Sequence, residues 1–293
     1  MNKKVILLSM DNTKNFFTYD KLLIDPMKNI GWDAEEISWR NENVDWNDYN
    51  AVIVRSTWDY QKDHKKFIEV LEKINNSSAH LENDLELMKW NMNKKYLFNL
   101  EQNEIRIVDT LWKTQFNFEE IANCFEIFKT NELIIKPNIS ANADNTFRLS
   151  KEKLAENKNE LELIYMNREF MVQPFMENII EEGEYSLFFF NGEFSHCVLK
   201  KPKEKDFRVQ EEHGGKFKSV VPTPELISIG KNIVSKISAT PLYARTDLVR
   251  TSDNDFALME LEIIEPSLYF NMDEQSPIKF TKAFEEKMKQ ISA

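Results

Sequence analysis

The sequence has very little glycine: there are six in 293 residues, and none lies between Gly31 and Gly183. The two common phosphate-binding motifs, GxxxxGK[ST] and GxGxxG, require glycines at fixed spacings that this chain does not contain. The composition therefore excludes P-loop NTPases and Rossmann dinucleotide-binding proteins.

Cysteine and histidine are also scarce. The two cysteines, Cys124 and Cys197, lie far apart, and the four histidines show neither an HExxH motif nor a paired spacing. A disulfide framework and a zinc site are therefore unsupported, and we expect both thiols to be buried as small apolar groups. No Ser/His or Cys/His motif for nucleophilic catalysis is apparent.

Clustered basic residues and long apolar runs are missing as well. The chain has 38 basic and 49 acidic side chains, a net charge of −11, so nucleic acid is not an expected partner. No segment approaches the ~20 apolar residues that span a membrane, and the apolar run near the N-terminus is too short for a signal peptide. We expect a cytoplasmic protein of about two domains without a membrane partner.

Hydrophobic periodicity divides the chain into two halves. The first half alternates short apolar strands with amphipathic helices, as in open α/β layers. We expect strands at 4–9, 51–55, 104–108 and 132–136, and helices at 62–75, 84–101, 117–128 and 151–165. From residue 168 the pattern is that of an antiparallel sheet, with a hairpin at Asn191-Gly192. Further strands are expected at 242–249 and 256–264, and helices at 223–238 and 277–291, so this half is α+β.

A pair of glutamates in the last predicted strand suggests a metal site. Glu260 and Glu262 are two residues apart and point to the same face of a strand. Neighbouring buried carboxylates repel each other unless a cation lies between them, and Mg²⁺ prefers oxygen ligands. Asp247 in the preceding strand would join them across a hairpin. An exposed acidic face of an edge strand is the alternative.

Two other strand ends could contact a nucleotide. Lys136 ends an apolar strand and is followed by a polar loop, so its ammonium group could meet a phosphate or simply extend into water. Pro174 ends the strand that contains Gln173 and precedes Phe175, and a proline leaves main-chain groups free at a hinge, where adenine could use them. On its own, this second feature is an ordinary strand end.

Together, in this order, these elements resemble the ATP-grasp superfamily, and in particular the ATP-binding region of bacterial glutathione synthetase. Four runs resemble the subgroup of small ATP-grasp ligases that includes O-ureido-serine cyclo-ligase: RSTWDY (55–60), GEYSLFFFNGEFSH (183–196), DFRVQEEHGG (206–215) and MELEIIEPSL (259–268). The resemblance implies an N-terminal α/β domain (1–90), a nucleotide-lid subdomain (91–175) and a C-terminal subdomain with the metal site (176–293).

The resemblance also implies ligands for ATP and for Mg²⁺, with Mn²⁺ as an alternative ion. Lys94 and Lys136 would bind phosphate, Gln173 and Phe175 would contact adenine, Glu184 would meet the nucleotide, and Asp247, Glu260 and Glu262 would hold the metal. The chain departs from the family at Glu262, where an asparagine is frequent. It also departs in the phosphate-covering loop (138–146), which lacks glycine and offers Ser140, Asn142 and Thr146 as donors.

The implied reaction activates a carboxylate as an acyl phosphate, which an amine captures, in the same molecule or in another. Lys136 and the metal would stabilise the transferred phosphoryl group. Arg208 would bind the acyl phosphate or the substrate carboxylate, unless it only pairs with Asp206 or Glu211. Substrate contacts are expected beyond the strand 51–55 and in the 206–215 loop; they are Arg55, Ser56, Thr57, Trp58, Asp59 and His213.

Purely structural roles are alternatives for several of these residues. Trp58 suits a core or interface aromatic equally well, and His213 would be one residue of a solvated charged loop. At the level of the whole chain, the glycine-poor loop favours a nucleotide-binding module without turnover, and a small-molecule kinase would use the same lysines and carboxylates. Small carboxylate and amine substrates are the expected partners, and the 12% aromatic content leaves room for a homo-oligomer interface.

Overall fold

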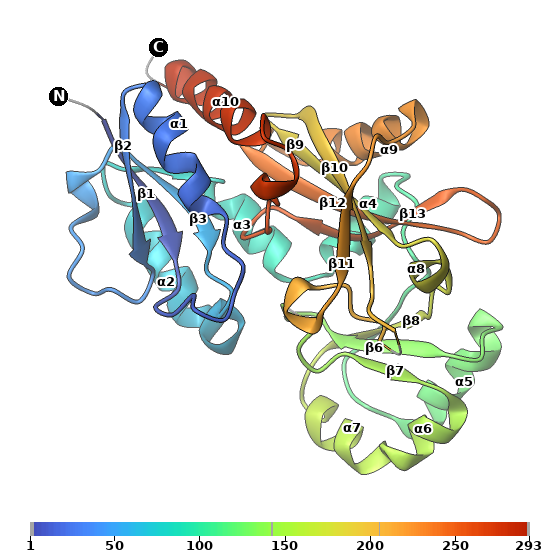
Figure 1. Ribbon diagram of the computed structural model, residues 1–293. Helices are drawn as coiled ribbons and strands as arrows, with labels where there is room; N and C mark the ends of the chain where they lie inside the picture. Colours follow the sequence, from blue (N-terminus) through green and yellow to red (C-terminus); the bar gives the residue numbers. More distant parts are fainter. Residues whose placement is uncertain (1–2, 142, 205, 292–293) are drawn as a thin grey trace.

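The computed structural model describes residues 3–141, 143–204 and 206–291, and these form three β-sheets with their helices (Figure 1). The N-terminal sheet is parallel, in the order β2-β1-β3-β4. Its strands are β1 (Lys3–Ser9), β2 (Trp32–Ser38), β3 (Ala51–Ser56) and β4 (His80–Glu82). Helix α2 (His64–Asn75) packs on one face, and α1 (Ile24–Asn29) packs on the other. The central strand β3 is buried throughout, as expected for a parallel sheet covered on both faces.

The small antiparallel sheet has the order β5-β8-β6-β7. Its strands are β5 (Leu111–Lys113), β6 (Leu133–Pro137), β7 (Phe147–Leu149) and β8 (Phe170–Pro174), and its helices are α5 (Phe118–Phe128), α6 (Lys151–Glu156) and α7 (Lys158–Tyr165). In Figure 1 this green part extends away from the rest of the molecule. Its apolar side chains form a separate core.

The five-stranded sheet is antiparallel, in the order β11-β10-β9-β12-β13. Its strands are β9 (Glu184–Phe190), β10 (Glu193–Lys201), β11 (Lys216–Ser219), β12 (Tyr243–Arg250) and β13 (Phe256–Glu262), preceded by the short helix α8 (Asn178–Glu181). Helix α9 (Pro224–Ser235) packs against Leu187 and Phe189, whereas α10 (Ser276–Ile291) packs against Phe188 and Phe190. Because successive side chains of β9 point to opposite faces of the sheet, this strand contributes to two separate cores.

Helix α10 also joins two of the sheets. Phe284 meets Trp32 of β2 edge-on at 4.8 Å between ring centroids, and Phe280 meets Phe190 of β9 at 5.3 Å. The N-terminal sheet is therefore held against the five-stranded sheet by shared apolar packing.

Two asparagine side chains bind the backbone near the edge strand β13. The Asn91 amide of α3 (Leu85–Met92) donates to the carbonyl of Leu261 at 2.8 Å and accepts from the N–H of Ile263 at 3.1 Å. Asn83 is fully buried, accepts from the N–H of Leu242 at 2.6 Å and donates to the carbonyl of Ile263 at 2.8 Å. These amides satisfy backbone groups that a neighbouring strand would otherwise pair with.

Several element boundaries differ from the prediction. The helix predicted at 84–101 is divided into α3 and α4 (Tyr96–Gln102), because Asn93 is extended and the Lys94 N–H donates to the carbonyl of Asn138 at 2.8 Å. The helix predicted at 151–165 is likewise two helices, α6 and α7. The strand predicted at 104–108 is reduced to one bridge, Ile107 to Leu258. Five strands, β2, β4, β5, β7 and β11, were not predicted, and four of them have only three or four residues.

Other expectations are confirmed. The fold class is α/β followed by α+β, the hairpin turns at Asn191-Gly192, and both cysteines are buried. The domain boundaries at 90 and 175 stay a prediction, although α4 packs on the five-stranded sheet and not on the small one. None of the helices described combines the length and apolarity that crossing a membrane requires.

Candidate active site

A cleft of about 220 Å³ lies where the three sheets meet. The small antiparallel sheet contributes one wall, the charged ends of the five-stranded sheet contribute the floor, and segments after β1 and β3 contribute the outer end. Ten of the predicted site residues line it: Lys94, Lys136, Ser140, Gln173, Phe175, Glu184, Arg208, Asp247, Glu260 and Glu262. Trp58 is an eleventh.

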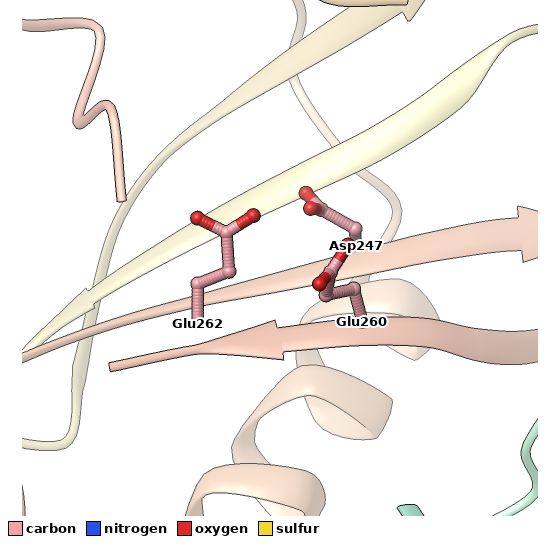
Figure 2. Close-up of side chains that lie close together, drawn as sticks. All are labelled: Asp247, Glu260 and Glu262. Carbon is pink, nitrogen blue, oxygen red and sulfur yellow. The ribbon is translucent and has the colours of Figure 1, made fainter. Parts of the chain in front are cut away.

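The floor of the cleft holds the three predicted metal ligands. Asp247 on β12 lies directly opposite Glu260 on β13, and Glu262 follows two residues later on the same face. One oxygen from each carboxylate lies within 4.8 Å of the other two. Figure 2 shows the three side chains extending from adjacent strands toward a common region. Three oxygen donors at this separation match the ligand preference of Mg²⁺.

Three cations surround these carboxylates. The Arg245 guanidinium donates to Asp247 at 2.9 Å and also to Glu262. The Lys200 ammonium lies 3.3 Å from Asp247 and is paired with Glu184, and Lys94 is paired with Glu260. The protein therefore compensates part of the negative charge with its own side chains, as buried carboxylates require.

The buried carboxyl groups of the cleft have pKa values shifted in different directions. Burial, together with the neighbouring Glu260 and Asp247, raises the pKa of Glu262 to about 7, against the effect of Arg245. Burial acts on Asp247 as well, but Arg245 and Lys200 outweigh it and hold the pKa of that carboxyl at about 2. Burial and Glu262 raise the pKa of Glu265 to about 8. Burial is the largest cause of both raised pKa values and the neighbouring carboxylates add to it, so a divalent cation bound to these oxygens would favour their charged forms.

The two predicted phosphate lysines differ in their surroundings. Lys94 is buried and paired with Glu260, and its pKa is raised by Glu260 although burial acts in the opposite direction. Lys136 on β6 forms no ion pair with any carboxylate of the described ranges, and burial, together with Lys94, lowers its pKa. Lys136 therefore faces the cleft without a direct ion pair among the described residues, although Glu260 attracts it and acts against the lowering of its pKa.

The predicted hinge residues lie where β8 ends. Gln173 donates through its side chain to the Thr110 hydroxyl at 2.9 Å, and the N–H of Phe175 donates to the carbonyl of Glu132 at 2.9 Å. The Arg148 guanidinium lies 3.7 Å from the centre of the Phe175 ring. In the phosphate-covering loop, Ser140 donates to a backbone carbonyl at 3.2 Å. Asn142 of the same loop lies outside the described residues.

The loop of residues 206–213 contributes one predicted residue to the cleft and leaves another outside it. Arg208 lines the cleft and pairs with Asp206 at 2.9 Å, which lowers the pKa of that carboxyl. His213 does not line the cleft, and its Nε2 is buried with no hydrogen-bond partner among the described residues. Glu211 and Glu212, which sequence reasoning did not assign to a site, do line it.

Of the five residues predicted after β3, only Trp58 reaches the cleft. Arg55 and Ser56 are buried against Asp20, with 3.0 Å between the Arg55 Nε and the Asp20 carboxylate. Thr57 is fully buried. Asp59 accepts from Trp39 at 2.7 Å and from Arg40 at 2.8 Å, on the side away from the cleft.

Two of these side chains instead position the backbone that follows β13. The Trp58 indole donates to the carbonyl of Glu265 at 2.7 Å, and the Arg55 guanidinium donates to the carbonyl of Pro266 at 2.9 Å. The geometry therefore supports an indirect role for Arg55, Ser56, Thr57 and Asp59 in the N-terminal sheet, and direct contact with substrate for Trp58 alone.

Residues 100–274 match the family model described as the prokaryotic glutathione synthetase ATP-grasp domain. The chain belongs to this family. The expectation of an ATP-grasp ligase is thereby confirmed, and the family uses ATP with Mg²⁺. Residues 5–83 match a second model, the N-terminal domain of D-cycloserine synthetase DcsG.

Individual relatives of this ATP-grasp ligase agree with the family models. The cycloserine biosynthesis protein DcsG of Streptomyces lavendulae is 23% identical, with 91% of this chain and 93% of the relative covered. The crystal structure of D-cycloserine synthetase DcsG superposes with a TM-score of 0.86 at 20% identity, covering 97% and 99% of the two chains. D-Alanine–D-alanine ligase of Bacillus anthracis superposes with a TM-score of 0.69 at 13% identity over 99% and 98%.

Sequence reasoning missed two cations of this ATP-grasp ligase, Arg245 and Lys200. Arg245 had a detectable signal, because it lies two residues before Asp247 on a strand and so shares its face. Lys200 faces the cleft only because a bulge near Ser195 shifts the β9–β10 register and brings Lys200 opposite Glu184. A regular hairpin closed at Asn191-Gly192 would have turned Lys200 to the other face of the sheet.

Proposed function

We propose that this ligase activates the carboxylate of a small amino-acid-like substrate with ATP and joins it to an amine, in the same molecule for a substrate that cyclises. In the first step a carboxylate oxygen bonds to the γ-phosphorus of ATP and ADP leaves. In the second step the amine nitrogen bonds to the acyl carbon, phosphate leaves with the bonding electrons, and the nitrogen loses a proton. The observation that carries the proposal is the carboxylate trio on the floor of a cleft lined by three lysines and two arginines.

The residues present fit a magnesium site. Asp247, Glu260 and Glu262 offer only oxygen donors, and a bound divalent cation would offset the mutual repulsion that adds to the burial of Glu262. When bound, Mg²⁺ supplies positive charge to the phosphate oxygens. Mn²⁺, which also accepts oxygen ligands, is the alternative ion. Arg245 and Lys94, which contact the trio in the nucleotide-free protein, are free to turn to anionic groups of the substrates once the carboxylates bind a metal.

Four cations would hold the anionic groups in place. Lys94 and Lys136 approach from α3–α4 and from β6, and we assign them to the phosphates of ATP. Arg245 and Arg208 lie toward the outer end, and their planar guanidinium groups suit a carboxylate or an acyl phosphate. Such fixed charges stabilise the transferred phosphoryl group without a nucleophilic side chain.

The nucleotide base would lie against the small antiparallel sheet. We assign Gln173 and Phe175 to adenine and Glu184 to the rest of the nucleoside, with Ser140 donating toward the phosphates. Gln173 and Phe175 flank Pro174 at the point where β8 ends, and both line the cleft there. The glycine-poor loop 138–146 is compatible with this role because Ser140 and Thr146 line the cleft.

The match of residues 5–83 to the DcsG N-terminal domain supports a substrate of the O-ureido-serine type, closed into a ring by attack of its own nitrogen on the acyl phosphate. The outer end of the cleft, where Trp58, Glu211 and Glu212 lie, is where we place this substrate. An intermolecular ligation would use the same activation step and differ only in the source of the amine.

Calorimetric titration tests the proposal first, with ATP and Mg²⁺ added to the purified protein. It is followed by a phosphate-release screen with both enantiomers of O-ureido-serine, and with amino acids singly and in pairs. We expect nucleotide binding that requires the metal, and phosphate release that requires one substrate or one pair. ADP formed together with a phosphorylated acceptor would identify a kinase instead, and binding without any turnover would identify a nucleotide-binding module.

A further inference from the structure

The 206–213 loop is anchored on one side of the cleft by an apolar contact. Val209 is buried with Val108, Ile179 and Val249 in a small hydrophobic cluster beside the five-stranded sheet. The loop closes tightly on itself, since the Gly215 N–H donates to the carbonyl of Gln210 at 3.1 Å. Val209 fixes one side of this short loop. The loop can hold Arg208 over the cleft only if a second contact fixes its other side.

A hydrogen bond from the N-terminal segment holds the other end. The Tyr19 hydroxyl, from the segment between β1 and α1, donates to both carboxylate oxygens of Glu211, at 2.9 and 3.1 Å. Burial and Glu211 both raise the pKa of Tyr19, so the hydroxyl keeps the proton that it donates. The contact joins residues 192 positions apart in the chain and is the direct link between the N-terminal segment and this loop.

The Tyr19 ring continues this link into the cleft wall. It packs against the ring of Tyr269 at 6.3 Å between centroids, and Tyr269 packs against Phe217 of β11 at 5.1 Å. Tyr269 lines the cleft, whereas Tyr19 lies behind Glu211. A substrate at the outer end would therefore contact Tyr269 and Glu211, and Tyr19 would act on it only through them.

We propose that Tyr19 and Glu211 are positioning residues that close the 206–213 loop over the substrate end of the cleft, fixing Arg208 and excluding water from the activated carboxylate. This inference rests on the proposed function for its catalytic consequences, but the closure itself does not. An acyl phosphate is readily hydrolysed, so an enzyme that forms one benefits from a site closed to solvent. Loss of the contact would leave the loop attached at Val209 alone.

The first test needs no substrate. Trypsin cleavage after Arg208 should be about tenfold faster in Tyr19→Phe and in Glu211→Ala than in the wild type, because an opened loop is accessible to protease. Tyr185→Phe is the matched control, since it removes a similar hydrogen bond, from Tyr185 to Glu182 at 2.7 Å, outside the cleft. Equal cleavage rates in all four proteins would overturn the proposal whatever reaction the enzyme catalyses.

The second test is kinetic. Tyr19→Phe should raise the KM of the amino-acid substrate by about tenfold, as expected for loss of one hydrogen bond to a charged group, and leave the KM of ATP unchanged. A larger share of ADP should form without ligated product, because water reaches the acyl phosphate. Glu211→Gln should keep the wild-type rate of trypsin cleavage after Arg208, since its amide oxygen still accepts from Tyr19.

The double variant Tyr19→Phe/Glu211→Ala separates a shared contact from two unrelated defects. If the residues act as one unit, the double variant should be no worse than either single variant. Additive effects, or an equal rise in the KM of ATP, would show that the substitutions disturb the site in another way and would refute the assignment. Absence of turnover in the wild type would contradict the proposed function while leaving the proteolysis result valid.

Discussion

Replacing Lys136 by methionine is expected to weaken ATP binding and, at the same time, to stabilise the nucleotide-free protein. Lys136 faces the cleft with no carboxylate of the described residues within ion-pair distance, and burial lowers its pKa. Burying a charge without a partner is unfavourable, so an apolar side chain of similar length should raise the free energy of unfolding by about 0.5–2 kcal/mol. A charge-assisted contact to phosphate is worth about 1.5–3 kcal/mol, so ATP should bind roughly 10- to 150-fold more weakly.

Lys94→Met is the matched comparison, because Lys94 lies in the same cleft but is paired with Glu260. Its removal leaves a partly buried carboxylate without a partner, which should lower the free energy of unfolding by about 1–3 kcal/mol. Both variants should therefore lose ATP affinity, while their stabilities change in opposite directions.

Urea unfolding without nucleotide and calorimetric titration with a non-hydrolysable ATP analogue and Mg²⁺ measure the two quantities. Wild-type affinity in Lys136→Met would contradict the assignment of this lysine to phosphate. A loss of stability in Lys136→Met equal to that in Lys94→Met would refute the electrostatic reasoning, whatever the binding result.

Four other substitutions address the metal, the turn that closes the 206–213 loop and a buried histidine. Glu260→Gln and Glu262→Gln should each abolish most of the metal dependence of nucleotide binding by calorimetry, and unchanged dependence would place the metal elsewhere. Gly215→Ala should reduce substrate-dependent ADP release at least tenfold with little change in melting temperature, because a Cβ there would lie 2.0 Å from the carbonyl oxygen of Val209 and force the loop apart. Burial lowers the pKa of His196 to about 4, so between about pH 6.5 and 4 the unfolded chain binds a proton that the folded chain does not. Stability should therefore fall by about 1 kcal/mol per pH unit in that range, and His196→Gln should show a shallower dependence in urea unfolding at pH 7 and pH 5.

Much of the floor of the cleft could be predicted because it depends on strand alternation. Glu260 and Glu262 must share a face of β13, so their grouping follows from local geometry, whereas Asp247 lies opposite Glu260 because the β12–β13 register shifts at Asp247/Leu248. The same rule identifies which residues of β9 face each helix. Features fixed within one hairpin or one strand are accessible to this kind of reasoning.

Features that depend on irregular backbone or on distant segments were not accessible. Lys200 faces the cleft because of a bulge near Ser195, and no pattern in the sequence predicted that bulge. Arg55 lies at the carboxyl end of the parallel strand β3, where ligand contacts are common, yet it is buried against Asp20, an acidic residue 35 positions earlier. The helix is divided at Asn93 because the Lys94 N–H donates to the carbonyl of Asn138. Local helix propensity carries no information about a partner that far along the chain.

The small antiparallel sheet differs from the rest of the molecule in how its core is assembled. Every residue of that core lies between positions 111 and 172. The core of the five-stranded sheet, and the core that this sheet shares with the N-terminal sheet, each combine distant parts of the chain. Among the described residues of the small sheet, Met171 of β8 and Trp112 of β5 pack into the core of the five-stranded sheet. A continuous stretch with its own core can unfold and refold locally while the remainder stays intact. Amide hydrogens of β6 and β8 should therefore exchange with solvent deuterium through a smaller opening than those of β9 and β12, and bound ATP, by bridging the two sheets, should slow this exchange.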